Sequence, residues 1–178
     1  MKSKVISLSA ISASFIAIAL IIGTYFEILD FFMLVTASVF VLLPLYLNSY
    51  KGSFLAYLVG GIIAILCGGF NFTLIYPAYF LFFGVYPIIN HKMMQKNVKK
   101  WLKIIIGLLW FILVAYICYF YYTLVLDLKV VIEGAPQWLD NFIVYGVGLL
   151  AVVFYFIYDR FITVIKFVMD KYLYRIIK

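Results

Sequence analysis

Tyrosine is the side chain with the most usable chemistry in this sequence, because it joins an aromatic ring to a hydroxyl that donates and accepts hydrogen bonds. Three tyrosines recur at every third position from 116 to 122, and this spacing predicts one helical face. Aromatic walls with a few hydrogen-bonding groups are typical of small-molecule pockets. We therefore predict a ligand-binding pocket formed by Asn71, Tyr76, Tyr79, Tyr116, Tyr119, Tyr122 and Trp138.

A second interpretation fits the same aromatic residues. Tyrosine and tryptophan also gather at the two surfaces of a membrane, where they bind no ligand. Tyr116 separates the two interpretations best, because the spans given below place it too deep for such an interfacial belt.

Catalytic chemistry is poorly represented. The single histidine, His91, stands beside Lys92 in a basic segment, and a histidine-based nucleophilic triad has no second histidine to draw on. No phosphate-binding P-loop occurs. Cys67 and Cys118 fall inside apolar stretches without metal or disulfide spacing. We expect no enzymatic activity, no metal and no cofactor.

The elements that position these residues follow from composition. Of 178 residues, 68% are hydrophobic and only 12% are charged, which is too few charges to cover a soluble domain. A bilayer core about 30 Å thick is crossed by about 20 helical residues. We predict one all-α membrane domain over residues 1–178, a bundle of six transmembrane helices at 5–26, 31–50, 53–70, 72–89, 104–126 and 142–158.

Six crossings put both termini on one side and sort the charges. That side holds 13 of the 14 lysines and arginines, and only Lys129 lies opposite. Since basic residues are retained in the cytoplasm, we predict that both termini are cytoplasmic. The net charge of +7 is thus explained by orientation in a lipid bilayer, and we expect no nucleic-acid partner. The richness in Ile, Lys, Tyr and Phe indicates an AT-rich bacterial genome. We expect the protein in the plasma membrane.

Small residues mark two helix faces for close packing, the main source of helix association in lipid. The first span carries Ser9, Ala13 and Ala17, and the third carries Ala56, Gly60, Ala64 and Gly68. We expect the third-span face to pack within the bundle. For the first span, contact with another subunit stays open beside contact within the bundle.

Prolines and the final segment complete the expected architecture. Pro44, Pro77 and Pro87 should kink their helices, because proline lacks the backbone donor. Residues 159–178 alternate apolar and basic side chains. They predict an amphipathic C-terminal extension that either lies on the inner leaflet or continues the sixth span.

This architecture resembles the substrate-binding S components of energy-coupling factor transporters, which are small six-helix membrane proteins with both termini inside. The segment Ala13-Ser14-Phe15-Ile16-Ala17 looks like that family's AxxxA motif, and Leu43-Pro44-Leu45-Tyr46 before the Gly-rich third span is also similar. The resemblance implies a membrane subunit that captures a vitamin-like micronutrient from the outer face. It also implies a membrane coupling subunit and ATP-binding subunits as partners, with Ala13 and Ala17 facing the coupling subunit.

Two other functions remain open. A structural or accessory subunit of a membrane or cell-envelope complex would use the same small-residue faces, and its tyrosines would form only a belt. A lipid-modifying or lipid-moving enzyme with carboxylates in the outer loops is the third possibility. A cavity lined by Tyr76, Tyr116 and Tyr119 would favour ligand capture, and a filled core would favour the accessory role.

Overall fold

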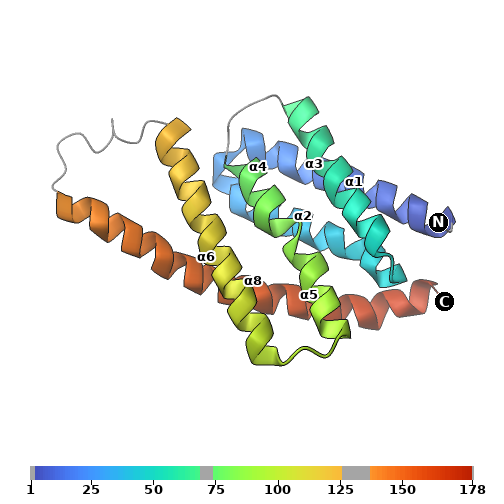
Figure 1. The fold of residues 1–178 in the computed structure, drawn as a ribbon. Helices are drawn as coiled ribbons and strands as arrows, with labels where there is room; N and C mark the ends of the chain where they lie inside the picture. The colour runs from blue at the N-terminus through green and yellow to red at the C-terminus, as the bar shows by residue number, and fades with distance from the viewer. Residues whose placement is uncertain (1–2, 69–73, 126–136, 178) are drawn as a thin grey trace.

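The chain is helical apart from short turns in the residues that the structure, a computed structural model, describes: 3–68, 74–125 and 137–177 (Figure 1). No strand forms in these three ranges. In chain order the elements are α1 (Ser3–Tyr25), the 3₁₀ turn η1 (Glu27–Leu29), α2 (Asp30–Leu42), the 3₁₀ turn η2 (Leu43–Leu47), α3 (Tyr50–Gly68), α4 (Ile75–Ala78), the π-helical turn η3 (Tyr79–Phe83), α5 (Tyr86–Gln95), α6 (Lys100–Val125) and α8 (Gln137–Ile177).

Five of the helical segments are long and apolar enough to cross a membrane. They cover residues 3–25, 30–47, 50–68, 100–121 and 145–169. The all-helical membrane class expected from composition is therefore supported, and five of the six predicted spans correspond to such segments. Both chain termini lie at the same end of the bundle in Figure 1.

The fourth predicted span, 72–89, differs most from a regular helix. Its described part is divided into α4, the π turn η3 and α5, and it continues to Gln95. The π turn is closed by a hydrogen bond of 2.8 Å from Gly84 N to Tyr79 O. Pro77 and Pro87 flank this turn, and their missing N–H groups explain why a regular α-helix is not maintained.

The broken segment leaves backbone carbonyls that three neighbouring helices satisfy with side-chain donors. Pro87 cannot donate to the carbonyl four residues earlier, at Phe83, and Ser38 of α2 supplies the donor instead. Buried backbone groups inside a membrane need such partners, because no water reaches them. The three bonds are Tyr57 Oη to Phe80 O at 3.0 Å, Trp110 Nε1 to Leu81 O at 2.9 Å and Ser38 Oγ to Phe83 O at 2.8 Å.

The small-residue faces of the first and third spans pack against each other. A Cβ on Gly60 of α3 would lie 2.7 Å from Ile16 Cγ2 and 2.9 Å from the carbonyl oxygen of Ala13. Ala13 and Ala17 of α1 are 5% and 4% exposed. The contact expected within the bundle for the third span is therefore confirmed, and it also takes up the small residues of the first span.

The connections depart from the sequence expectations at two places. The predicted spans 31–50 and 53–70 leave Lys51 and Gly52 as the turn between them. The turn lies earlier, where Asn48 adopts a left-handed φ of 51°, a conformation asparagine tolerates well. Ser49 Oγ then accepts from Gly52 N at 3.1 Å, so α3 already begins at Tyr50. Between the predicted spans 72–89 and 104–126 we expect a basic connection at 91–103. It shortens to 96–99, because α5 includes His91 and Lys92.

The sixth predicted span and the C-terminal extension form one helix. α8 has 41 residues, which corresponds to about 60 Å. Beyond the expected span end at Tyr158, Ile162 is buried and Ile165 and Met169 pack against the core, while Phe167 is exposed. Of the two placements expected for the extension, continuation of the sixth span is the one observed.

Candidate functional site

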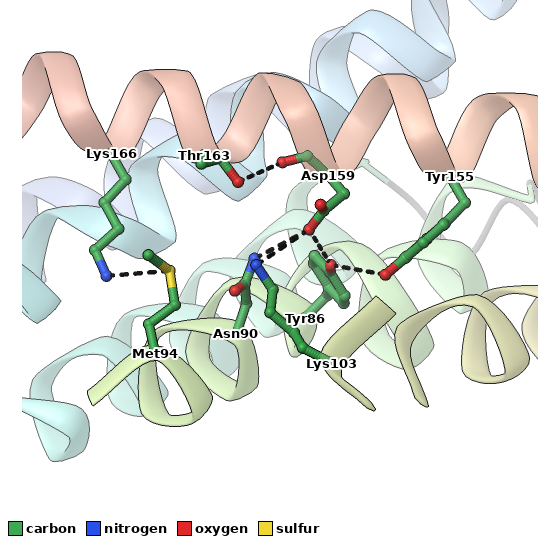
Figure 2. Close-up of polar contacts among 8 residues, drawn as sticks. All are labelled: Tyr86, Asn90, Met94, Lys103, Tyr155, Asp159, Thr163 and Lys166. Carbon is green, nitrogen blue, oxygen red and sulfur yellow. Dashed lines mark hydrogen bonds and ion pairs between the residues drawn. The ribbon is translucent and has the colours of Figure 1, made fainter. Parts of the chain in front are cut away.

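Three helices, α5, α6 and α8, bring an aspartate, a lysine and three neutral polar side chains together (Figure 2). Asp159 of α8 accepts a hydrogen bond of 2.6 Å from Tyr86 Oη at the start of α5. Its Oδ1 also lies 3.4 Å from Nζ of Lys103 on α6 and 3.5 Å from Nδ2 of Asn90 on α5. The hydrogen bond from Tyr86 is short, as expected for a donor facing a carboxylate. We call Tyr86, Asn90, Lys103, Tyr155 and Asp159 the Asp159 cluster.

Tyr155 extends the cluster by one hydroxyl. Its Oη lies 3.2 Å from Tyr86 Oη. Because Tyr86 directs its single hydroxyl hydrogen to Asp159, Tyr155 is the donor in this contact. A glycine on α6 makes the arrangement possible, since a Cβ on Gly107 would overlap Tyr155 Oη and lie 2.9 Å from its Cζ. The chain of donors therefore runs from Tyr155 through Tyr86 to the carboxylate.

The cluster is almost completely removed from solvent. Tyr155 is 0% exposed and Asn90 3%, and the side chains of Lys103 and Asp159 are each 13% exposed. Asn90 must turn its amide nitrogen to the carboxylate, because its oxygen would be repelled there, and its Oδ1 is left buried without a hydrogen-bond partner. Burial of an ion pair costs desolvation energy, and ionisable groups inside membranes usually serve a function.

Beside the cluster, α5 and α6 enclose a partly open groove of about 330 Å³. Its walls are almost entirely apolar, and the polar residues among them are Tyr86, Asn90 and Lys103 of the cluster. A volume of this size is at the lower end of the ~300–1,000 Å³ common for ligand sites. The apolar lining consists of Ile89, Met93, Ile106, Gly107, Leu109, Trp110 and Leu113.

The tyrosines expected to line an outer pocket do not line this groove. Tyr76 is buried, donates to Ala64 O at 3.1 Å and lies 3.0 Å from Thr24 Oγ1. Tyr79 is also buried and donates to Tyr57 O at 3.2 Å. Both hydroxyls therefore have partners within the chain, and their rings fill the core.

The remaining members of the expected pocket are placed in part. Tyr116 of α6 is 37% exposed, and its Oη lies 3.0 Å from the position of a Cβ on Gly148 of α8. Tyr119, one turn later, is half-buried. Asn71 and the side chains of Tyr122 and Trp138 lie outside the described residues. Tyr76 and Tyr79 thus belong to the core, and Tyr116 lies against α8.

The two alanines expected to face a coupling subunit are buried in the chain's own core. Ala13 and Ala17 both belong to the core cluster, in the close contact of α1 with α3. Their side chains therefore present no surface to a partner. The exposed large hydrophobic side chains on the same helix belong to Ile6, Ile11, Phe15, Ile18 and Tyr25.

The sequence did not reveal the Asp159 cluster, because the predicted spans begin just after Lys103 and end just before Asp159, which leaves both residues outside the membrane-spanning helices. One signal was available: Asp159 lies within the apolar segment 145–169, where a solitary acid needs a partner. Lys103, by contrast, follows two other lysines at 99 and 100, and nothing in its spacing distinguishes the one that turns inward.

The site holds no metal-binding chemistry in the part of the chain that the structure describes. No group of three or more His, Cys, Asp or Glu side chains lies close enough there to hold an ion.

No family model matches the chain, and neither a curated protein nor a solved structure matches it. The Asp159 cluster and the groove are the features of the described chain that point to a function.

Proposed function

We propose that the chain crosses the plasma membrane six times with both termini in the cytoplasm. The five spanning helices support this, together with residues 74–95, which as a helical rod have about the 30 Å reach of a bilayer core. The shared end of the two termini in Figure 1 agrees with an even number of crossings. The excess of lysine and arginine at that end favours the cytoplasmic side.

We further propose that the protein is a substrate-binding subunit of an ATP-driven micronutrient uptake transporter. The observation that carries the binding role is the Asp159 cluster beside the α5–α6 groove. An apolar wall with a few convergent polar groups is the usual composition of a ligand site. The groove takes the place of the outer tyrosine pocket as the ligand site in this proposal. In the six-crossing topology it lies in the cytoplasmic half of the bundle, so a ligand taken up from outside would reach it through the bilayer and not from the outer solvent. The resemblance to S components supplies the transporter context, with a coupling subunit and ATP-binding subunits as partners.

An accessory role in a membrane or cell-envelope complex is the second candidate. The buried, hydrogen-bonded Tyr76 and Tyr79 favour it, because a filled core in place of the expected pocket is what that role requires. Under this alternative the Asp159 cluster would only hold α5, α6 and α8 together.

Purification from native membranes in mild detergent tests the two candidates. Mass spectrometry of the purified complex should find ATP-binding subunits together with a small molecule that is lost when Ile106 in the groove is replaced by Phe. The matched control is Leu102→Phe, one turn earlier on α6, at an exposed residue outside the groove lining. Recovery of envelope proteins without any ATPase would support the accessory role and contradict the transporter.

Cysteine accessibility tests the topology separately. With Cys67 and Cys118 replaced by alanine, a single cysteine at Lys51 or Lys99 should react with a membrane-impermeant maleimide only after the cells are opened. A cysteine at Lys129 should react in intact cells. Reaction of all three from the same side would contradict six crossings.

A further inference from the structure

We propose that the ligand of the α5–α6 groove is a single-chain anionic amphiphile that enters sideways from the membrane, with its apolar chain along the groove and its anionic end on the lysines of the α5–α6 turn. The inference rests on the proposed function in one respect, the use of this groove as the ligand site. It adds the chemical class of the ligand and its route of entry.

The groove opens toward the side of the molecule that lipid chains would contact. Several side chains that line the groove are also exposed on the surface: Leu109 is 64% exposed and Leu113 is 51% exposed. Ile89, Ile106 and Trp110 are also exposed. A site for a water-soluble ligand would be closed off from the hydrocarbon, whereas these residues form a continuous apolar path from lipid into the groove.

Positive charge lies at one end of the groove. Lys103 lines it, and Lys99 and Lys100 precede Lys103 by one turn, so all three lie near one face of α6. Lys92 in the last turn of α5 and Lys96 at its C-cap add two charges. Lys92, Lys96, Lys99 and Lys100 are all exposed. Asp159 neutralises only Lys103, so the turn keeps a surplus of positive charge that attracts an anion.

The size of the groove favours one chain over two. Its volume of about 330 Å³ is near the minimum for ligand sites. The groove is also narrowed by the indole of Trp110, which is fixed by its hydrogen bond to Leu81 O. A two-chain phospholipid would have to leave one chain outside, so a free single-chain carboxylate is the occupant that we propose.

Fluorescence quenching of Trp110 tests the proposal on the purified chain in neutral detergent. Trp101→Phe and Trp138→Phe leave Trp110 as the single tryptophan, so that the tryptophan emission reports on the groove. A fatty acid brominated in mid-chain should quench it saturably, and the alcohol of the same chain length should bind about tenfold more weakly. Replacing Lys99 and Lys100 by Gln should weaken the binding of the fatty acid by a similar factor. Lys51→Gln, on an exposed lysine at the start of α3, should leave the affinity for the fatty acid unchanged.

Each other outcome overturns a defined part of the proposal. Equal binding of acid and alcohol would remove the anionic end from the ligand, and displacement of the fatty acid by an anionic phospholipid at equal concentration would make the occupant a membrane lipid. Linear quenching without saturation would exclude this groove as a binding site. Circular dichroism of each variant should show the same helical signal as the unchanged protein, which controls for loss of the fold. Because the assay uses the chain alone, its result is independent of whether ATP-binding subunits are found.

Discussion

Replacing Asp159 by Asn is the sharpest test of the buried cluster. The substitution keeps the volume of the side chain and an oxygen that can still accept from Tyr86. It removes the counter-ion of Lys103, whose side chain is only 13% exposed. We therefore expect the protein to fold with the same helices but with reduced stability.

The size of the loss follows from the two contacts. Removing one partner of a buried ion pair costs about 3–5 kcal/mol, and the Tyr86 bond loses about 1 kcal/mol when its acceptor becomes neutral. Part of this loss is recovered, because Lys103 lies three residues from the start of α6 and its long flexible side chain can turn its ammonium group toward water. We expect a net destabilisation of about 2–3 kcal/mol.

Reversible unfolding in detergent micelles, followed by circular dichroism, measures this loss. The double variant Lys103→Met with Asp159→Asn should recover part of the stability, because it removes both charges and keeps an oxygen that accepts from Tyr86. Lys100→Met, at an exposed lysine on the same helix, should change the stability by less than about 0.5 kcal/mol. A loss below about 0.5 kcal/mol for Asp159→Asn, or a double variant no more stable than the sum of the single changes, would refute the ion pair as a structural link.

Three further substitutions test the packing that holds the site, each by the same unfolding measurement. Ser38→Ala should cost about 1–2 kcal/mol, because it leaves the buried carbonyl of Phe83 without a donor. Ser14→Ala, at an exposed helix position, should leave the stability unchanged. Equal losses for the two variants would contradict the role of Ser38 as the donor to Phe83. Gly107→Ala should cost about 1–3 kcal/mol by overlap with a tyrosine of α8, whereas Gly146→Ala, with open space around it, should gain up to about 1 kcal/mol. Ala13→Leu should destabilise the fold by about 1–3 kcal/mol, whereas Ser14→Leu, at an exposed position, should leave the stability unchanged. If Ala13→Leu also left the stability unchanged, Ala13 would not be packed in the core.

The sequence predicted the parts of the fold that depend on composition and length. Continuous apolar runs identified the helices, and the small residues of the third span identified one of its packing faces. The path of residues 74–95 was harder to predict, because its π turn depends on donors from other helices. Ser38, for example, lies 45 positions before its partner Phe83, and no spacing in the sequence signals that pairing.

The candidate site was less accessible to sequence reasoning for a related reason. Tyrosine at helical spacing fits both a pocket and a core, and only the contacts of Tyr76 and Tyr79 with backbone carbonyls assign these two residues to the core. Asp159 and Lys103 are 56 positions apart, on helices whose register against each other depends on Gly107 meeting Tyr155. Such a register follows from side-chain fit between helices, which a single sequence does not encode in a periodic form.

The irregular segment and the buried cluster depend on each other. Three hydrogen bonds to the carbonyls of residues 80, 81 and 83 fix the π turn to α2, α3 and α6, and Tyr86 follows directly at the start of α5. The position of its hydroxyl, and hence its 2.6 Å bond to Asp159, is therefore set by the core. Trp110 makes one of those three bonds and also lines the groove. A ligand that displaces its indole would consequently disturb the π turn as well, and through Tyr86 it would reach α8.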